Sequence, residues 1–229
     1  MAAVAIGVKG PKMRIGVLGG TGPAGTAIAV RYGAVGVEVV VGSRSEERAV
    51  ATVERLRQNW PGRDLALLPG TNKVAAGADI VVLATPWDGA TTTARELAGE
   101  LTGKIVVSMV NAMVQWGARL VPLFPPTGSV ANAVARTLPM SRVAGAFHHL
   151  PAGLLLDLDQ KLEADVMVFS DARSTTDEVI DLVNKVPGLR GIDVGGLNSA
   201  MAVEAMTAAL LEVNRRYKAH ASLRVTGIE

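Results

Sequence analysis

Hydrophobic residues in this chain form short unbroken runs that alternate with segments of helical periodicity. The apolar runs predict strands at residues 13–18, 37–41, 65–68, 78–84, 104–109, 142–147, 165–169 and 189–194. Helical periodicity predicts helices at residues 22–32, 45–57, 91–101, 130–137, 174–184 and 198–219. An unbroken apolar run indicates a strand that is buried on both faces, and the alternation with helices indicates βαβ units. The pattern therefore predicts an α/β fold with a Rossmann-type, doubly wound, mostly parallel sheet and a small C-terminal helical portion.

The expected domain organisation follows from this pattern. Residues 13–195 are expected to form the nucleotide-binding domain, and residues 196–229 a C-terminal helical portion that completes a substrate cleft. Residues 1–12 form an expected N-terminal extension, because Lys9 and Lys12 follow its apolar part, the reverse of a signal peptide. The segment 117–128 contains Pro122, Pro125 and Pro126 and is expected to be a loop, either a lid or a rigid connector.

Composition narrows the classes of function. Hydrophobic residues make up 49% of the 229 positions but aromatic residues only 3%, so the core is expected to be aliphatic. A formal net charge of +2 gives no reason to expect nucleic acid or a membrane surface as partner. The chain has no cysteine, which excludes disulfides and thiolate catalysis and fits a reducing compartment. We therefore expect a cytoplasmic protein that acts on small molecules.

A glycine-rich segment follows the first predicted strand and opens the first predicted helix. It reads Gly20-Thr21-Gly22-Pro23-Ala24-Gly25 and matches the dinucleotide-binding pattern G-x-G-x-x-G. Gly20 permits a tight turn, Gly22 leaves room for the pyrophosphate, and Gly25 lets the helix lie close to the strands. The helix N-terminus then offers free N–H groups to the phosphates. The alternative is a glycine turn that binds no ligand, and it leaves the position of the motif between a strand and a helix unexplained.

The residues after the second predicted strand indicate which dinucleotide binds. NAD sites usually carry an acidic residue here for the ribose hydroxyls. This chain has Ser43 and Arg44, with Arg48 one helical turn later. A hydroxyl and two guanidinium groups suit a 2′-phosphate, which a carboxylate would repel. The sequence therefore predicts NADP(H), although the same residues would also serve as an ordinary solvated loop.

Several sequence blocks together resemble one enzyme family. They are Leu18-Gly19-Gly20-Thr21-Gly22 with Gly25, Val41-Gly42-Ser43-Arg44 with Glu46-Glu47, Thr85-Pro86-Trp87, Ala146-Phe147-His148-His149-Leu150-Pro151-Ala152, and the looser Val203-Glu204-Ala205-Met206-Thr207. With these blocks, the chain resembles the NADPH-dependent reductases of the deazaflavin coenzyme F420 from residue 13 to about residue 216. The block that begins at Ala146 is the most specific of them.

The resemblance implies a function and a set of contacts. It implies a homodimer in which a hydride passes directly between NADP(H) and coenzyme F420, whose rings stack in a cleft. Carried over to this chain, the contacts with NADP fall to Thr21, Ser43, Arg44 and Arg48, and Thr85, Pro86 and Trp87 border the nicotinamide. His148 and Leu150 lie where the two rings meet, and Ala152, Ala205 and Thr207 are further cofactor-binding candidates. The long helix forms part of the deazaflavin wall.

Two departures leave other functions open. The family often has serine where this chain has Ala205, and the segment 109–113 differs from the family's proline-containing version. One alternative is an NADP-dependent reductase of a small carbonyl or imine. Such enzymes usually offer an acid such as lysine, but Lys161, Lys185 and Lys218 do not fall at positions expected for a buried acid. The other alternative is a non-catalytic NADP-binding protein.

Other polar residues have competing interpretations. His148 and His149 either contact the cofactor or form a loop pair with one packed and one solvated ring. Glu204 caps a loop, faces the cleft, or lies on the polar edge of its helix. The chain's three histidines do not suggest a metal site. The apolar positions of the long helix exceed those needed for one core-facing stripe, so we expect this helix to contribute to a dimer interface.

Overall fold

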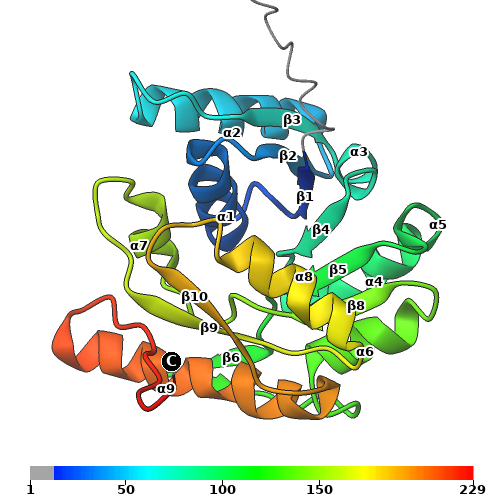
Figure 1. The fold of residues 1–229 in the computed structure, drawn as a ribbon, viewed down its shortest axis with the longest axis vertical. Coiled ribbons are helices and arrows are strands. Elements are labelled where there is room, and N and C mark those ends of the chain that lie inside the picture. The colour runs from blue at the N-terminus through cyan, green and yellow to red at the C-terminus, as the bar shows by residue number, and fades with distance from the viewer. Residues whose placement is uncertain (1–12, 229) are drawn as a thin grey trace, which may run out of the picture.

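The centre of the molecule is a six-stranded parallel sheet with the strand order β3-β2-β1-β4-β5-β8, seen in the computed structural model of Figure 1. The structure describes residues 13–228. The strands are β1 Arg14–Leu18, β2 Glu38–Ser43, β3 Leu67–Thr71, β4 Ile80–Leu83, β5 Ile105–Ser108 and β8 Arg142–Gly145. All five strand pairings in this sheet are parallel. The predicted Rossmann-type, mostly parallel sheet is confirmed.

Helices cover both faces of this sheet. They are α1 Pro23–Ala34, α2 Glu46–Asn59, α3 Asn72–Ala76, α4 Ala90–Glu96, α5 Ala98–Leu101, α6 Val130–Thr137, α7 Ala152–Leu156, α8 Arg173–Val183 and α9 Ala200–Tyr217, with short 3-10 turns η1 Trp87–Gly89 and η2 Leu197–Ser199. One apolar cluster joins the sheet to α1, α2, α7 and α8. A second cluster joins the other face to α3, α4, α6 and the start of α9. The sheet is therefore doubly wound.

The side chains of each strand explain why both faces of the sheet are buried. In β4, Ile80 and Val82 belong to the first cluster, whereas Val81 and Leu83 belong to the second. Side chains alternate along a strand, so an unbroken apolar run supplies both faces. In β1 the alternation includes Gly16, where an added Cβ would lie 1.8 Å from the carbonyl oxygen of Ala75 in α3. Glycine is required there because α3 packs directly on the strand.

The segment after β8 forms a separate small sheet. Strands β9 Ala164–Val168 and β10 Leu189–Asp193 pair in parallel. A single antiparallel bridge between Gly145 and Phe169 connects them to the end of β8. Figure 1 shows α9 running along the edge of the molecule below this pair. The β9–β10 pair therefore lies against the carboxyl end of β8.

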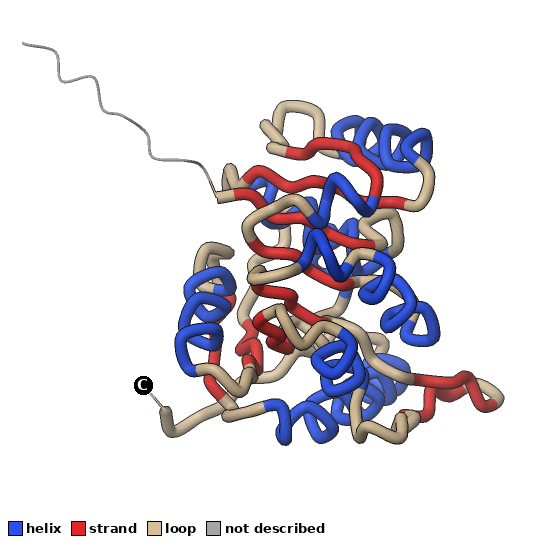
Figure 2. The backbone as a smooth tube through the Cα atoms, turned by 90° about the vertical axis from the view of Figure 1, so that its right-hand side faces the viewer, coloured by secondary structure: helices blue, strands red, loops and turns tan. Residues whose placement is uncertain are grey.

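Two short strands form a hairpin whose second strand lies within the predicted loop. β6 Met113–Trp116 and β7 Arg119–Pro122 form an antiparallel hairpin at the periphery of the molecule (Figure 2). The prediction of an irregular segment at 117–128 is therefore wrong for residues 119–122. Gly117 has φ +59° at the first of the two turn residues, a conformation that suits glycine in a two-residue hairpin turn. Pro122 is tolerated because it is the last residue of an edge strand.

Other differences from the predicted elements are local. The expected helix at 91–101 is divided, because Leu97 leaves the helical conformation (φ −109°, ψ 13°) while its side chain stays buried. The short helices α3 and α7 lie outside the predicted ranges. The predicted N-cap of α2 is confirmed, since the Ser45 hydroxyl accepts a hydrogen bond from the N–H of Arg48. Residues 1–12, expected as an extension, lie outside the described part.

Between residues 13 and 228, the structure contains no helix of the length and apolarity needed to cross a membrane.

Candidate functional site

A cleft of about 570 Å³ lies at the carboxyl ends of the central strands. Its lining comes from the segments that follow β1, β2, β3 and β4, and comprises Gly19, Thr21, Gly22, Ser43, Arg44, Arg48, Asn72, Ala84, Thr85, Pro86, Asp88, Gly89 and Thr93. The strand order reverses between β1 and β4, and open α/β sheets bind ligands at such a switch point. The cleft is therefore where a dinucleotide site is expected.

The three motif glycines have distinct surroundings. An added Cβ on Gly25 would lie 2.7 Å from the carbonyl oxygen of Gly19, so this glycine brings α1 close to the loop. An added Cβ on Gly20 would lie 3.0 Å from the backbone nitrogen of Gly42, and Gly20 donates its N–H to the Gly42 carbonyl oxygen at 2.8 Å. An added Cβ on Gly22 would meet nothing nearer than 3.5 Å. Gly20 and Gly25 thus shape the turn, while Gly22 faces open space in the cleft.

The N-terminus of α1 is open toward this cleft. Its N-cap residue is Gly22, which makes no side-chain capping hydrogen bond, and Pro23 follows in the first turn. By contrast, Ser45 caps α2, and Ser129 caps α6 through the N–H of Asn132. The first N–H groups of a helix lack partners within the helix. The first turn of α1 is therefore available to an anion.

The end of β2 carries the predicted cationic group. Ser43 is buried, and its hydroxyl oxygen accepts a hydrogen bond from the N–H of Ser45 at 3.3 Å. Arg44 and Arg48 line the same side of the cleft, and neither forms an ion pair within residues 13–228. These two guanidinium groups therefore keep their charge available for a ligand phosphate.

Three lining residues lie outside the sequence motifs. Asn72 begins α3, and its side-chain oxygen accepts a hydrogen bond from the N–H of Gly19 at 3.2 Å, which holds the start of the glycine loop. Asp88 and Thr93 come from η1 and α4, after β4. Residues that follow β3 lie at the carboxyl edge of the sheet, as do those after every parallel strand, but no sequence motif marks Asn72 among them.

The predicted site residues divide into two groups. Seven of them line the cleft: Thr21, Gly22, Ser43, Arg44, Arg48, Thr85 and Pro86. The other predicted residues are not part of its lining: Gly20, Pro23, Ala24, Gly25, Trp87, His148, Leu150, Ala152, Ala205 and Thr207. Trp87 is 39% exposed at the rim. The second group includes a separate cluster around the end of β8.

Three segments meet at the backbone of His148. Its carbonyl oxygen accepts a hydrogen bond from the side-chain amide of Asn111 at 2.8 Å and lies 3.2 Å from the hydroxyl of Thr207. The same hydroxyl lies 3.2 Å from the side-chain oxygen of Asn111. Thr207 comes from α9 and Asn111 from the segment after β5. The sequence blocks that contain His148 and Thr207 are therefore in contact.

The His148 ring is enclosed by the protein. It stacks on Phe169, with ring centroids 5.5 Å apart and an interplanar angle of 17°. Only 4% of the residue is exposed, and neither ring nitrogen has a hydrogen-bond partner in the described chain. Burial, with a smaller contribution from His149, lowers the pKa of His148 to about 3. The ring is therefore neutral at physiological pH.

His149 is also packed in the interior. Its Nε2 lies 2.8 Å from the carbonyl oxygen of Asp165, and burial lowers the pKa of His149 to about 4. The alternative with one packed and one solvated histidine is therefore wrong. Sequence patterns do not indicate this burial, because the two rings contact Asp165 of β9 and Phe169, which come later in the chain.

Unpaired polar atoms gather at the ends of three neighbouring strands. Thr85 Oγ1 follows β4, Ser108 Oγ ends β5, and the His148 ring nitrogens follow β8; none has a hydrogen-bond partner within residues 13–228. These strands are adjacent in the sheet. Buried polar atoms are normally hydrogen-bonded, and exceptions need an explanation. Phe147, between β8 and His148, has φ +66°, an unusual conformation for an aromatic residue.

Glu204 links the two helices α9 and α6. Its carboxylate is buried and accepts hydrogen bonds from the N–H groups of Val130 and Ala131, both at 2.9 Å. Burial outweighs these two hydrogen bonds and raises the pKa of Glu204 to about 7. Of the interpretations weighed for this residue, capping is the one observed, although it caps a helix rather than a loop. No cluster of metal-ligating residues is present in the described part of the chain.

The fold and the cleft define a Rossmann-type dinucleotide-binding protein, and comparison with known proteins identifies its family. The family model "NADP oxidoreductase coenzyme F420-dependent" matches residues 14–112. A protein named F420-dependent NADP reductase from Methanocaldococcus jannaschii is 35% identical over 225 residues, covering 95% of this chain and 100% of the relative. A protein of the same name from Methanothermobacter thermautotrophicus is 31% identical over 224 residues, covering 94% of this chain and 96% of the relative. The chain belongs to the F420-dependent NADP reductase family.

A solved structure agrees with this assignment at the level of the fold. The crystal structure of a putative F420-dependent NADP reductase from Arthrobacter sp. FB24 superposes with a TM-score of 0.76. It is 23% identical to this chain, and the superposition covers 95% of this chain and 100% of that one. The similarity therefore extends over β9, β10 and α9 as well as the central sheet.

Proposed function

We propose that this protein transfers a hydride between NADP(H) and the deazaflavin coenzyme F420. The observation that carries the proposal is the cleft at the switch point of the sheet, which has Ser43, Arg44 and Arg48 in place of an acidic residue. Family membership supports the choice of coenzyme F420 as the second substrate. The protein is accordingly an NADP-dependent oxidoreductase.

The residues of the cleft fit NADP. Gly22 leaves space beside the open N-terminus of α1, where the pyrophosphate would lie. Arg44 and Arg48 would hold the 2′-phosphate, and the Ser43 hydroxyl would hydrogen-bond to it. Thr85 and Pro86 lead from this cleft toward the nicotinamide half, and Thr85 Oγ1 is a buried hydroxyl without a partner in the described chain. We also retain Thr21 as a phosphate contact.

The second substrate would lie beside the cluster at the end of β8. Bound coenzyme F420 supplies a ring carbon that accepts or returns a hydride. Leu150 and His148 would border the two rings there, with Ala152, Ala205, Thr207 and Trp87 as further contacts. The ring nitrogens of His148 and the hydroxyl of Ser108 at this edge are unpaired within the described chain but covered by other side chains, so a ligand would reach them only after those side chains move.

The role of these residues would be positional. Hydride transfer needs two rings held face to face with water excluded. The neutral, buried His148 ring stacked on Phe169 is suited to shape such a pocket and to donate or accept one hydrogen bond. It is poorly suited to carry a positive charge. We propose that the transfer is direct, without a metal or a covalent intermediate.

Reduction of a small carbonyl or imine is the weaker alternative. Such a reaction needs a proton donor beside the substrate. Lys161, Lys185 and Lys218 are all exposed, and none lines the cleft. A non-catalytic role is also weaker, because the polar atoms left unpaired at the three strand ends have no structural use within the described chain.

We further propose a homodimer in which α9 and the β6–β7 hairpin form the interface. Met201, Val213 and Tyr217 on α9 are exposed, and the hairpin, which packs against α9, exposes the apolar side chains of Val114, Trp116, Leu120 and Val121. Large apolar side chains exposed on neighbouring elements are typical of an interaction site. We also propose that the nucleotide-binding domain ends at residue 195, where a C-terminal portion begins. Because the chain has no cysteine, we propose a cytoplasmic location.

The test uses NADPH deuterated at its transferable position. The expected result is consumption of NADPH only when coenzyme F420 is present, with deuterium recovered on the deazaflavin ring and not in water. Deuterium in the solvent would indicate an intermediate carrier. Lack of turnover at saturating coenzyme F420, with NADPH still bound, would reject the proposed reaction.

A further inference from the structure

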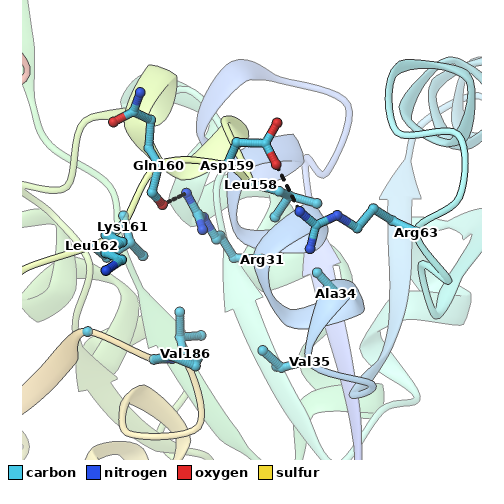
Figure 3. Close-up of a pocket in the computed structure, with 12 residues that line it drawn as sticks. Arg31, Ala34, Val35, Arg63, Leu158, Asp159, Gln160, Lys161, Leu162 and Val186 are labelled. Atoms are coloured by element: carbon cyan, nitrogen blue, oxygen red, sulfur yellow. Dashed lines mark hydrogen bonds and ion pairs between the residues drawn. The ribbon is translucent and has the colours of Figure 1, made fainter.

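Arg31 is a buried arginine in the last turn of α1 that forms no ion pair within residues 13–228. The residue is 8% exposed, and its guanidinium donates hydrogen bonds to backbone carbonyl groups. Nε donates to Leu155 at 2.7 Å, and Nη2 donates to Leu154 at 2.7 Å, to Gln160 at 3.2 Å and to Asp157. Figure 3 shows the Arg31 side chain reaching toward the segment that carries Gln160.

The acceptors of Arg31 belong to the C-terminal end of α7 and the loop that follows. The last carbonyl groups of a helix have no partners within the helix. Leu154 and Leu155 are in the last turn of α7, so Arg31 satisfies two such groups and places a positive charge at the end of the helix, where it is favourable. The helix α7 is only five residues long and packs against α1. Arg31 is therefore a main polar attachment of α7 to the rest of the protein.

The helix α7 directly continues the segment that holds the candidate hydride-transfer residues. Its N-cap is Pro151, whose carbonyl oxygen accepts the N–H of Leu155 at 3.1 Å, and the N–H of Leu150 donates to Phe147 at 3.3 Å. The chain from His148 to Leu155 is thus a hydrogen-bonded turn followed by one short helix. A displacement of α7 would move Leu150 and Ala152 with it.

The helix α1, which carries Arg31 in its last turn, begins at the phosphate loop. Arg31 lies eight residues after Pro23, which corresponds to roughly 12 Å along the axis of α1. The first turn of α1 borders the dinucleotide cleft. One helix therefore carries the phosphate-binding turn at its N-terminal end and the attachment of α7 at its C-terminal end.

We propose that Arg31 is a positioning residue for hydride transfer, because it holds α7, and with it the segment 148–152, in a fixed place relative to the bound nucleotide. This inference rests on the proposed function. Arg31 lies too far from the phosphate loop to contact NADP, so its loss should affect the rate of transfer more than nucleotide binding. Small displacements of reacting groups are sufficient, since an error of about 1 Å can cost a hundredfold in rate.

The test compares Arg31→Gln with three other variants. Arg31→Lys keeps a charged donor of similar reach. Arg63→Gln removes an exposed arginine that lines the pocket of Figure 3 together with Arg31 but pairs with the side chain of Asp159. Leu101→Ala creates a cavity in the apolar cluster on the other face of the sheet and controls for lost stability. Each variant is assayed for NADPH affinity, for the single-turnover rate with saturating NADPH and coenzyme F420, and for amide hydrogen exchange of residues 147–157.

The expected result is specific to Arg31. Arg31→Gln should lower the single-turnover rate about tenfold to a hundredfold, keep the dissociation constant of NADPH within about threefold, and increase amide exchange in α7. Arg31→Lys should recover a large part of the rate and of the exchange protection. Arg63→Gln and Leu101→Ala should transfer hydride at the wild-type rate at a temperature where both are folded.

Other outcomes separate this inference from the proposed function. An unchanged rate for Arg31→Gln in an enzyme that turns over coenzyme F420 would overturn the role of Arg31 and leave the function standing. A rate loss equal to that of Leu101→Ala, without rescue by lysine, would reduce Arg31 to a structural residue and also overturn the inference. A wild-type protein that binds NADPH but does not reduce coenzyme F420 would overturn the proposed function, and with it any role of Arg31 in that reaction.

Discussion

The carboxylate of Glu204, in the first half of α9, accepts a hydrogen bond from the N–H of Val130, which is the first residue of α6. The adjacent N–H of Ala131 donates to the same carboxylate. Glu204 therefore acts together with the Ser129 hydroxyl to cap α6. This capping joins the C-terminal helix to the central domain, and its strength depends on the protonation state of one buried acid.

The first prediction concerns the pH dependence of stability. Folding raises the pKa of Glu204 from 4.5 to about 7, so the folded state binds this proton more tightly than the unfolded state. The resulting stabilisation is complete below about pH 4.5 and is lost as the pH rises through 7. Between these limits, we expect the free energy of unfolding of the wild type to fall by about 2–3 kcal/mol relative to that of Glu204→Gln.

Urea denaturation of both proteins at pH 4.5, 6 and 8 measures this difference. His148 and His149 change stability in the opposite direction, because burial lowers their pKa values and their protonation at low pH favours the unfolded state. Both histidines are present in both proteins, so their effect cancels in the comparison. A difference between wild type and Glu204→Gln that stays constant with pH would show that Glu204 does not titrate on unfolding.

The second prediction concerns nucleotide choice. Arg44→Ala removes one charge-assisted contact with the 2′-phosphate, which is worth about 1.5–3 kcal/mol. The dissociation constant of NADPH should rise by roughly tenfold to a hundredfold, whereas that of NADH should change little. Arg55→Ala, an exposed arginine on α2 outside the cleft, is the control and should bind NADPH normally. Equal affinity of the wild type for NADPH and NADH would exclude a 2′-phosphate site at Arg44.

The cleft could be predicted in large part because its determinants are local in sequence. The glycine motif and the residues after β2 each follow a strand directly, so the alternation of strands and helices brings them to one edge. Asn72 and Asp88 lie at the same edge but follow β3 and β4 without a recognisable motif. Their contribution depends on the order of the strands, which sequence patterns do not reveal at the level of single residues.

The surroundings of His148 could not be predicted in the same way. The ring is enclosed by Phe169 from the small second sheet, and its backbone is held by Thr207 from α9. Both contacts join residues far apart in the sequence. The hairpin was missed for a different reason: Gly117 and Pro122 are typical of loops, yet the first forms a two-residue turn and the second ends an edge strand.

The third prediction concerns assembly. If α9 and the hairpin pair with a second copy, light scattering at micromolar concentration should give twice the mass of the 23.7 kDa chain. Trp116, on β6, is 77% exposed, so Trp116→Glu places a charge within the proposed interface and should yield monomers. Met140→Glu changes an apolar residue that is 69% exposed in the turn before β8, away from this surface, and should leave the dimer intact. A wild-type protein of monomeric mass would reject the interface.

The fourth prediction concerns Leu150. This residue is partly buried against the apolar cluster that includes α1 and α7, and it lies at the start of the segment that Arg31 attaches. Leu150→Ala should leave space beside the stacked rings and lower the single-turnover rate, because the rings are held less closely. NADPH affinity should be retained, since the phosphates bind elsewhere. Measuring both quantities on one preparation tests this, and a parallel loss of affinity would place Leu150 in the nucleotide site.

The last prediction concerns the protonation state of His148. Its pKa of about 3 keeps the ring neutral from pH 5 to pH 9, so the single-turnover rate should show no ionisation near 6.5, the ordinary value for histidine. His148→Ala should slow transfer by only about tenfold to a hundredfold, because acid–base catalysts usually contribute 10²–10⁴-fold. His148→Asn, which keeps a polar group of similar size, should be slowed less than His148→Ala. A bell-shaped profile with an inflection near 6.5 that disappears in His148→Asn would mean that the ring takes up a proton during the reaction, and its role would then be acid–base catalysis.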